Sequence, residues 1–571
     1  MINRRKFLKN SSIFGIAPFL PNYNIFKHMN KKIRTAHIGV GGMGKADLND
    51  IASHKKAQIV ALCDVDNKAL VEAGKLFPEA KLFKDYRVML KNIHDEIDAV
   101  IVSTPDHTHA PASIMAMELN KHVYCQKPLT HHVSEARAMK KLAEEKNLVT
   151  QMGIQVHSFY DYKLATLLIK SGIIGKVDKV RAWCPKNWGY DGPEPSGNDP
   201  IPNYLDWNLW LGTSKERPFK DKIYHPGMWR KLVDFGCGTL GDMGVHIFDT
   251  PYNALDLDVP YTIKNKCRKP NNFGFPEKNY VEYVFPGTKY TTDTLTWIWE
   301  DGKDSPKKHK DLKLPNGDKL PLQGAMFMGE KGKLLLPHFM ELPKLIVDNE
   351  YKDFDVSKFV DNGELSEIPV RDYGKESHLH YHQFIDTCLG EDECTAPFSY
   401  SSRLTETILL GVIAGRFPGK TLHWDSLKAK FKEENGFALT YLPFISIATI
   451  SALREYSVVN SSFDLENGIH EIHNHINLGI AVDLNQEGLL VGNLQEADSF
   501  NLKGIARKIS ETSKLLRSGK YGLNDVSGTT FTISNNGSFN SFLTSPIINQ
   551  PNVAILSTAV SYTHLTLPTK A

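Results

Sequence analysis

Three glycines near the start of the chain have the spacing of a phosphate-binding turn. The apolar run 35–40, which is typical of a β-strand, leads into Gly39, Gly41 and Gly44, which read G-x-G-x-x-G. In such a turn one glycine bends the chain sharply, one lets the backbone approach a pyrophosphate, and one lets strand and helix pack closely. The phosphate binds the free N–H groups at the positive end of the following helix. Tight turns without a ligand also favour glycine, so the motif needs support from its context.

A carboxylate further along the chain provides this support. The apolar run 58–63 ends at Asp64, about 20 residues after the glycines, where an acidic side chain can bind a ribose 2′-hydroxyl. Because a carboxylate repels the 2′-phosphate of NADP, we expect a dinucleotide site that prefers NAD. Gly42 and Met43 lie within the glycine turn and are expected to contact the same cofactor.

The elements that must position these residues alternate between strand and helix over residues 33–155. Expected strands cover residues 33–40, 58–63, 99–103, 122–125 and 149–152, and expected helices cover 45–54, 67–77, 110–119 and 134–146. This alternation predicts an α/β fold with a parallel sheet covered by helices on both faces. Ligands of such sheets bind at the carboxyl ends of the strands. These ends carry the glycine turn, Asp64 and the segments 104–109 and 126–128.

Three ordered motifs resemble the Gfo/Idh/MocA oxidoreductase family. They are STPDHTHA at 103–110, HVYCQKPLT at 122–130 and GCGTLGDMGVHIFD at 236–249. The resemblance extends over about residues 33–425. It implies an NAD-binding Rossmann domain at 33–155, followed at 156–428 by an α/β domain with an open mixed or antiparallel sheet. The second domain of this family supports the substrate and often forms an interface between copies, so a homo-oligomer is implied.

The resemblance assigns catalytic roles to Lys127, Asp242 and His246. The physical chemistry agrees, because a D-x-x-x-H pair on a helix lies on one face and a histidine can accept a hydroxyl proton near neutral pH. Considered singly, these residues are more typical of a solvated lysine, a helix cap and a core histidine, and it is their occurrence together in motif order that favours the catalytic roles. Gln126 stands where the family has glutamate, so one cofactor contact changes from charged to neutral. The implied cofactor contacts beyond the glycine turn are Asp64, Thr104, Pro105, His107, His109, Gln126, Lys127 and Gln155.

An aromatic segment that follows the nucleotide domain is a candidate sugar-binding surface. Trp188, Tyr224, His225 and Trp229 combine rings with polar groups, as the face and hydroxyls of a sugar require. A proline-rich surface loop with buried anchors explains the same residues. No metal is expected. His107 and His109 are explained by the cofactor loop, and His378, His380 and His382 are more typical of surface or pocket histidines than of zinc ligands.

Composition and the N-terminus bear on compartment and partners. The 571 residues carry a net charge of +3, so the sequence has no excess of basic residues that would indicate nucleic-acid binding. Seven scattered cysteines do not form a disulfide framework, and no apolar run approaches the roughly 18 residues of a membrane span. Arg4 and Arg5 precede the short apolar run 13–20, which resembles a twin-arginine export signal over residues 1–32. This indicates a periplasmic or exported protein, with a cytoplasmic protein as the alternative.

The chain changes character after Asp425. Residues 434–560 resemble the catalytic domain of dihydrolipoamide acyltransferases, but the H-x-x-x-D-G motif that supplies the general base of that family is not found here. We therefore expect this part to be inactive. Residues 561–571 resemble a translated sequencing adapter. These observations favour a chimera of two proteins, with a genuine fusion carrying a degenerate accessory domain as the alternative.

Three classes of function fit the sequence. The first is an NAD-dependent oxidoreductase that acts on a sugar or sugar derivative by hydride transfer. The second is a redox-neutral glycoside hydrolase of the same fold, which oxidises and reduces its substrate again on a retained NAD. The third is a binding protein without turnover. The first is the broadest class, and the order of Lys127, Asp242 and His246 argues against the third.

Overall fold

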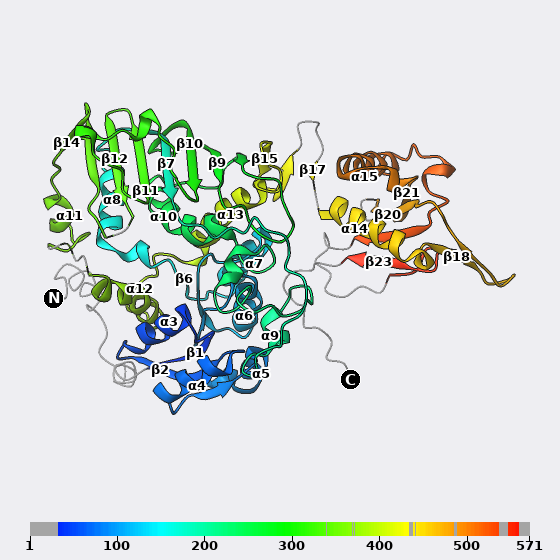
Figure 1. Cartoon of the computed structure of the whole chain (residues 1–571), viewed down its shortest axis with the longest axis horizontal. Coiled ribbons are helices and arrows are strands. Elements are labelled where there is room, and N and C mark those ends of the chain that lie inside the picture. Colours follow the sequence, from blue (N-terminus) through cyan, green and yellow to red (C-terminus); the bar gives the residue numbers. More distant parts are fainter. Residues whose placement is uncertain are drawn as a thin grey trace, which may run out of the picture.

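The computed structural model describes residues 32–558, except for 339, 368, 370–371, 433–437, 440, 485–487 and 536–545. Residues 1–31 of the expected export signal and the whole of the expected tail 561–571 lie outside the described residues. The described elements form a nucleotide-binding part, a second α/β part and a C-terminal part (Figure 1).

The first part contains a six-stranded parallel sheet with the order β3-β2-β1-β4-β5-β6. This is the strand order of dinucleotide-binding folds, and it confirms the predicted fold class. Its strands are β1 (Ile33–Ile38), β2 (Ala57–Cys63), β3 (Lys81–Phe83), β4 (Ala99–Val102), β5 (His122–Cys125) and β6 (Thr150–Met152). Its helices are α3 (Met43–Ala52), α4 (Asn67–Leu76), α5 (Tyr86–Ile93), α6 (Asp106–Glu118) and α7 (Val133–Glu145). The order changes direction between β1 and β4, and this is where ligands bind to such sheets.

The second part is built on an eleven-stranded sheet. Its order is β14-β13-β12-β11-β7-β10-β9-β8-β15-β16-β17, and only the β7–β10 pair is parallel. The strands are β7 (Val177–Cys184), β8 (Thr262–Lys266), β9 (Tyr280–Pro286), β10 (Thr291–Asp301), β11 (Gly324–Gly329), β12 (Gly332–Pro337), β13 (Lys344–Val347), β14 (Glu350–Lys352), β15 (Thr421–Asp425), β16 (Lys430–Lys432) and β17 (Ala438–Leu439). The helices are α8 (Tyr160–Lys170), α9 (Trp207–Leu211), α10 (Val245–Ala254), α11 (Ser357–Asp361), α12 (Tyr373–Cys388) and α13 (Phe398–Ala414). The open mixed sheet agrees with the prediction.

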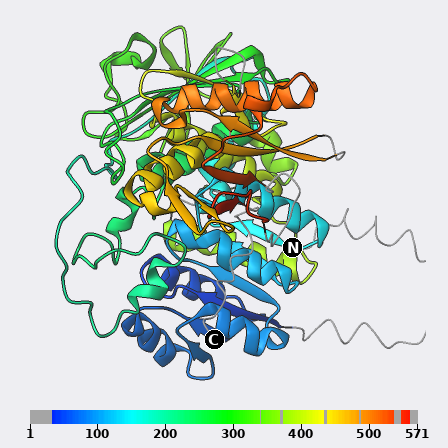
Figure 2. The ribbon, with the colours of Figure 1, turned by 90° about the vertical axis from the view of Figure 1, so that its right-hand side faces the viewer.

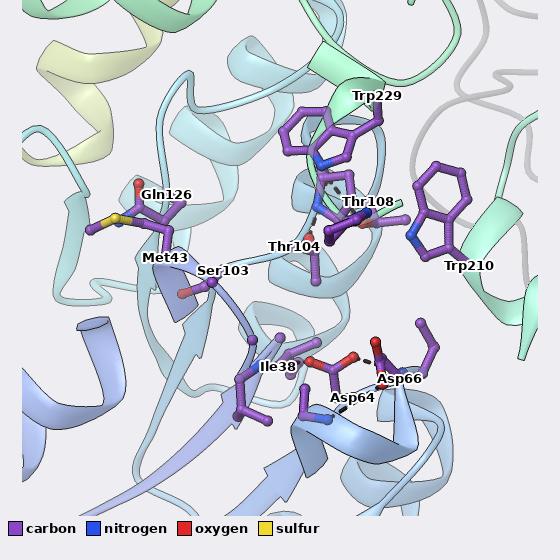
Figure 3. A pocket seen from close by; sticks show the side chains of 18 of the residues that line it. Ile38, Met43, Asp64, Asp66, Ser103, Thr104, Thr108, Gln126, Trp210 and Trp229 are labelled. Atoms are coloured by element: carbon purple, nitrogen blue, oxygen red, sulfur yellow. Dashed lines mark hydrogen bonds between the residues drawn. The ribbon is translucent and has the colours of Figure 1, made fainter. Parts of the chain in front are cut away.

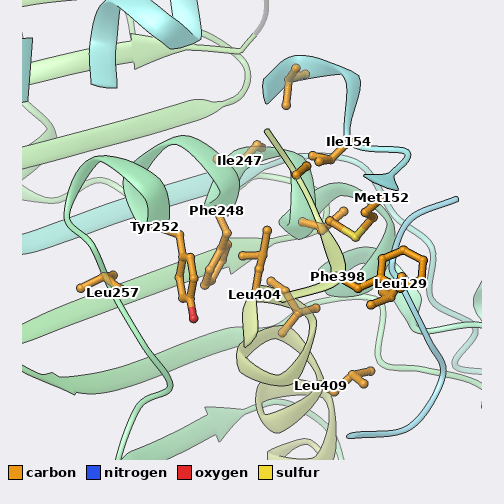
Figure 4. Packing of buried hydrophobic residues seen from close by; sticks show 14 of the residues in the cluster. Leu129, Met152, Ile154, Ile247, Phe248, Tyr252, Leu257, Phe398, Leu404 and Leu409 are labelled. Atoms are coloured by element: carbon orange, nitrogen blue, oxygen red, sulfur yellow. The ribbon is translucent and has the colours of Figure 1, made fainter. Parts of the chain in front are cut away.

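One hydrophobic core joins the two parts. Phe248 and Tyr252 of α10 pack beside Leu404 of α13, and Leu129 and Met152 of the nucleotide-binding part reach the same cluster (Figure 4). Burial of such side chains stabilises a fold by about 1.5–3 kcal/mol each. The helices that carry the candidate catalytic residues are therefore fixed relative to the Rossmann sheet.

Helix α12 makes a second connection between the two parts. It packs against α3, and its side chains Tyr381, Phe384 and Ile385 share a cluster with Ile33 and Tyr124 of the Rossmann sheet. A helix that comes late in the chain thus contributes to the core beneath the cofactor turn.

The C-terminal part has a hydrophobic core of its own, built around Leu478, Ile480 and Ile505. It contains α14 (Tyr441–Glu455), α15 (Leu502–Arg517), the hairpin β18 (Ser461–Asp464) and β19 (Ile469–Ile472), and a sheet of β20 (Leu478–Asp483), β21 (Leu489–Leu494), β22 (Phe531–Asn535) and β23 (Ile555–Thr558). It lies beside the second part (Figure 1) and faces the viewer in Figure 2. Among the residues described, no helix has the length and apolar character needed to cross a membrane.

Candidate active site

A cavity of about 1130 Å³ lies at the carboxyl ends of β1, β2, β4 and β5. Its floor is the glycine turn with Asp64 and Gln126, and Trp210 and Trp229 of the second part lie across it (Figure 3). Lys127 and His246 also line this cavity. The structure therefore brings the expected cofactor turn and two of the three expected catalytic residues into one space.

Two positions of the glycine turn exclude any other residue. Gly39 has φ +83°, and a Cβ there would lie 2.5 Å from the carbonyl oxygen of Ser103. A Cβ on Gly44 would lie 2.2 Å from the carbonyl oxygen of Gly39. Helix α3 begins at Met43, and no side chain caps its N-terminus. The positive end of that helix is therefore available to a phosphate.

Asp64 is held beside the turn by two backbone donors. The N–H groups of Val40 and Asp66 donate to its two carboxylate oxygens, each at 2.8 Å. Burial raises the pKa of Asp64, and these two hydrogen bonds oppose the increase. A Cβ on Gly41 would lie 3.9 Å from the same carboxylate, so the acidic group adjoins the turn as a ribose contact requires.

The residues expected on the loop after β4 separate into two groups. Thr104 and Pro105 line the cavity, whereas His107 and His109 are 3% and 1% exposed and are not among its lining residues. The ring nitrogens of His109 lie 2.9 and 2.8 Å from the carbonyl oxygens of Pro128 and Thr104. Burial lowers the pKa of both histidines to about 4. Their contacts position the loops that surround the site.

Gln126 belongs to a buried network that sequence reasoning missed. Its amide nitrogen donates to both carboxylate oxygens of Asp47 at 3.0 Å, and Tyr381 donates to Asp47 at 2.6 Å. Gln155 donates to the Tyr381 hydroxyl at 2.8 Å. Burial raises the pKa of Asp47 to about 6. An amide at position 126 suits this setting, since a glutamate would place a second carboxylate against Asp47.

Lys127 and Asp242 form an ion pair across the cavity wall. The Lys127 Nζ donates to Asp242 Oδ1 at 2.8 Å and to the Asp242 carbonyl oxygen at 2.9 Å, while Arg230 Nε donates to the same Oδ1 at 3.3 Å. Burial disfavours the charged form of Asp242, but Lys127 and Arg230 outweigh it and hold the pKa of Asp242 well below its usual range. Asp242 is therefore an anion that orients two cations.

His246 follows Asp242 after a local change in helix type. A π-helical turn, Leu240–Gly244, precedes α10, so Asp242 lies in the π turn and His246 in the α-helix that follows it. Such π turns occur frequently at functional sites. Burial, reinforced by the Lys127 charge, lowers the pKa of His246 well below its ordinary value. Its Nδ1 is buried and has no hydrogen-bond partner in the part of the chain that the structure describes. A neutral imidazole is thus placed at the cavity.

Asp106 is a further residue of this site that the sequence reasoning missed. It is the first residue of α6, is 4% exposed and lines the cavity. Burial raises its pKa to about 7, although Arg230 and Lys127 act in the opposite direction. Its position in D-H-T-H, at the start of the helix that follows a buried strand, is the sequence signal that could have identified it.

The four aromatic candidates for substrate binding have different surroundings. Trp229 lines the cavity, and the Arg230 guanidinium lies 4.2 Å from the centre of its ring. Trp188 and Tyr224 are not among the lining residues, and Tyr224 is buried in an aromatic cluster around Trp210. His225 lines the cavity, but its Nε2 lies 2.8 Å from Asp66 Oδ2, on the ribose side of the site.

No group of three or more histidine, cysteine, aspartate or glutamate side chains among the described residues could hold a metal ion. The histidines 378, 380 and 382 lie on α12, and His380 and His382 contact different parts of the chain. His380 is buried between Ser158 and the Met152 carbonyl, and His382 lies 2.7 Å from the Ser53 hydroxyl.

Comparison with family models covers three segments of the chain. Residues 33–154 match the oxidoreductase family with an NAD-binding Rossmann fold, and residues 161–272 match the C-terminal alpha/beta domain of the same oxidoreductase family. This part of the chain belongs to the Gfo/Idh/MocA oxidoreductases. The predicted family, the enzyme class and the NAD cofactor are thereby confirmed.

Residues 421–564 match the catalytic domain of the 2-oxoacid dehydrogenase acyltransferases, so the chain carries segments of two families, as predicted. A succinyltransferase component of the 2-oxoglutarate dehydrogenase complex from Cupriavidus necator is 39% identical over 129 residues, which are 23% of this chain and 30% of that protein. An acetyltransferase component of the pyruvate dehydrogenase complex from Staphylococcus aureus is 42% identical over 137 residues, 23% of this chain and 31% of that protein. The chain spans about a third of the length of these curated relatives.

Solved structures resemble the oxidoreductase part at low identity. An oxidoreductase domain protein from Kribbella flavida has a TM-score of 0.49 and 18% identity, over 67% of this chain and 97% of its own. A levoglucosan dehydrogenase in complex with NADH has a TM-score of 0.49 and 17% identity, over 67% of this chain and 98% of its own.

Proposed function

We propose that this protein oxidises a carbon of a sugar or sugar derivative by hydride transfer to NAD. The observation that carries the proposal is that Lys127 and the neutral His246 line the same cavity as the glycine turn and Asp64, while Asp242 pairs with Lys127 at the cavity wall. When bound, NAD accepts the hydride from the carbon that carries the hydroxyl group. The residues of the chain must then remove the hydroxyl proton.

The geometry assigns separate tasks to the three side chains. Lys127 donates to Asp242, so its ammonium can also donate to the substrate oxygen and hold it in place. The neutral imidazole of His246, which lines the cavity, can accept the hydroxyl proton as the C–H bond gives up its hydride. Asp242 remains ionised and keeps Lys127 and Arg230 oriented. Asp64 would hold the ribose, and the turn at Gly39–Gly44 would hold the pyrophosphate.

A redox-neutral glycoside hydrolase is the second candidate. The reason is a strap, defined here as residues 204–225 of the second part, which contacts residues 66–68 at the edge of the cavity beside Asp64. The Asn67 N–H donates to the Tyr204 carbonyl at 2.7 Å, the Lys68 ammonium lies 3.6 Å from the centre of the Tyr204 ring, and His225 pairs with Asp66. A strap in this position would retain NAD between turnovers, as this mechanism requires.

One experiment separates the two candidates. Purified full-length protein is incubated with free sugars and with glycosides, and NADH absorbance and released aglycone are both recorded with and without added NAD. A dehydrogenase produces NADH in proportion to the sugar and needs added NAD. A redox-neutral hydrolase releases aglycone with no net NADH. Absence of both products over a broad panel would contradict the proposed function.

We also propose that the protein is exported, on the basis of the Arg4–Arg5 pair and the apolar run after it. A reporter fused behind residues 1–32 tests this proposal. Secretion that persists after Arg4→Lys with Arg5→Lys would contradict it.

A further inference from the structure

A second cavity of about 540 Å³ adjoins the catalytic end of the first cavity. Met243 and His338 line both cavities, so the two spaces adjoin at these side chains. Met243 directly follows Asp242, and the His338 ring lies 6.1 Å from the His246 ring. The second cavity therefore begins beside the groups proposed to act on the sugar.

The walls of the second cavity come from three neighbouring strands of the eleven-stranded sheet. Pro185 and Lys186 follow β7, residues 321–323 precede β11, and His338 and Glu341 follow β12. These strands are adjacent and paired in the sheet, which gives the walls a rigid base. The volume falls within the range of roughly 300–1,000 Å³ found for small-molecule sites.

The lining of this cavity combines apolar surfaces with a polar rim. Pro185, Pro321, Met243 and Leu322 supply the apolar surfaces, and Leu322 is 80% exposed. A single exposed leucine is common on protein surfaces, but this one borders a concave space that opens toward the catalytic residues. Flat apolar walls beside hydrogen-bonding groups suit the faces and hydroxyls of a sugar ring.

The charges of the rim favour a neutral ligand. Lys186 supplies one cation and Glu341 one anion, and Gln323 adds an uncharged amide. The Lys186 ammonium also lies 3.9 Å from Asp242 Oδ2 and 3.5 Å from Met243 Sδ, so part of its charge is already compensated. A phosphate or uronate would be repelled by Glu341, and the rim has no excess of positive charge to offset that repulsion. A neutral polyol can instead form hydrogen bonds with Lys186, Gln323 and Glu341.

From these observations we infer that the second cavity is a subsite for the second unit of a glycoside whose first unit reacts at His246. The inference rests on the proposed sugar chemistry and narrows it to a disaccharide or a larger glycoside. The main cavity must hold a whole dinucleotide as well as the reacting ring, so the second unit needs this additional space.

The test compares monosaccharides with their disaccharides on the full-length, NAD-loaded protein. Glucose, galactose, maltose, cellobiose and lactose are the probes, and both NADH formation and binding by titration calorimetry are measured. Leu322→Asp and Glu341→Ala alter the second cavity. Leu427→Asp and Glu364→Ala are matched controls, because both positions are exposed and lie outside both cavities.

We expect the disaccharide of the accepted sugar to have a kcat/KM at least about tenfold above that of the monosaccharide. Leu322→Asp and Glu341→Ala should abolish most of this advantage, leave the monosaccharide unchanged and differ from the controls. A disaccharide that binds without turnover supports the subsite if the same two variants weaken its binding. Two results would overturn the subsite while leaving the proposed function intact. One is an equal kcat/KM for monosaccharide and disaccharide in the wild type, and the other is an equal loss of kcat/KM for both sugars in the two variants. If neither sugar type binds or reacts, the proposed function and the subsite both fail.

Discussion

Lys127 Nζ lies 2.8 Å from Asp242 Oδ1, which pairs a side chain that follows β5 of the Rossmann sheet with one from the π-helical turn before α10. The two side chains are 13% and 12% exposed, so solvent screens this pair less than a surface ion pair. Asp242 also receives a hydrogen bond from Arg230. The pair therefore depends on the packing of the two parts and would be lost if they separated.

The first prediction concerns the choice of cofactor. Asp64→Ala removes the carboxylate that adjoins the glycine turn and is held by the N–H groups of Val40 and Asp66. We expect NAD affinity to fall about tenfold or more and the preference for NAD over NADP to narrow, because the repulsion of a 2′-phosphate is also removed. Fluorescence titration with both nucleotides measures the ratio. A wild-type protein that prefers NADP would refute the assignment of Asp64.

The second prediction concerns the amide at position 126. Gln126→Glu places two carboxylates about 3 Å apart, as the Gln126–Asp47 contacts indicate, so one must retain a proton at a raised pKa. A pKa raised in the folded state gives stability that is lost as pH rises through it. We expect a loss of about 1–3 kcal/mol at pH 8 and a smaller loss at pH 5. The double variant Gln126→Glu with Asp47→Asn restores one amide and one carboxylate, and it should recover most of the loss in urea unfolding. No recovery would show that the network is misread.

The third prediction concerns acid sensitivity. His37, the second-last residue of β1, is fully buried, and burial lowers its pKa to about 3. Because the folded-state pKa lies below the unfolded value of about 6.5, its stabilising contribution is present above pH 6.5 and is lost as pH falls toward 3. Protonation of His37 in the unfolded chain should by itself lower the free energy of unfolding by about 2 kcal/mol between pH 7 and pH 5. His37→Leu should reduce that pH dependence by a similar amount, and an unchanged slope would contradict the buried neutral state.

The fourth prediction concerns the C-terminal part, which has its own core around Leu478 and Ile505. A chain of residues 32–432 keeps β15 and β16 and the hydrogen bond from Arg137 to the Ser426 carbonyl. We expect it to fold with the cofactor affinity and turnover of the full chain to within about twofold. Loss of soluble folded protein would show that the two families depend on each other structurally.

The Rossmann part could be predicted from the sequence because its strands are nearly continuous apolar runs. All four residues of β4 are buried, and β5 has the predicted bounds. The exposed edge strand β3 and helix α5 were missed, since Lys81–Phe83 offers no apolar run. Most strands of the second sheet were not predicted individually, because alternating patterns in a largely antiparallel sheet give a weaker signal than buried parallel strands.

The candidate site was predicted in part. The Gly39–Gly44 turn, Asp64 and the order of Lys127, Asp242 and His246 are local patterns that a sequence displays. The contact between Gln126 and Asp47 joins residues 79 positions apart, and Tyr381 comes from 334 positions beyond Asp47. Such partners are set by tertiary packing, so no local pattern of residues identifies them. The burial of Tyr224 likewise depends on the aromatic cluster around it.

The fifth prediction concerns the assistance that Lys127 and His246 are proposed to give to hydride transfer to NAD. NADH formation is measured with an accepted sugar and its deuterated form at the oxidised carbon, for the wild type, Lys127→Ala, His246→Ala and the control Lys319→Ala at an exposed site outside the cavity. We expect both active-site variants to lose about 10²–10⁴-fold in kcat while NAD affinity and the control stay unchanged, with a deuterium effect on the slowed step. Near-full turnover in the Lys127 and His246 variants would contradict the account.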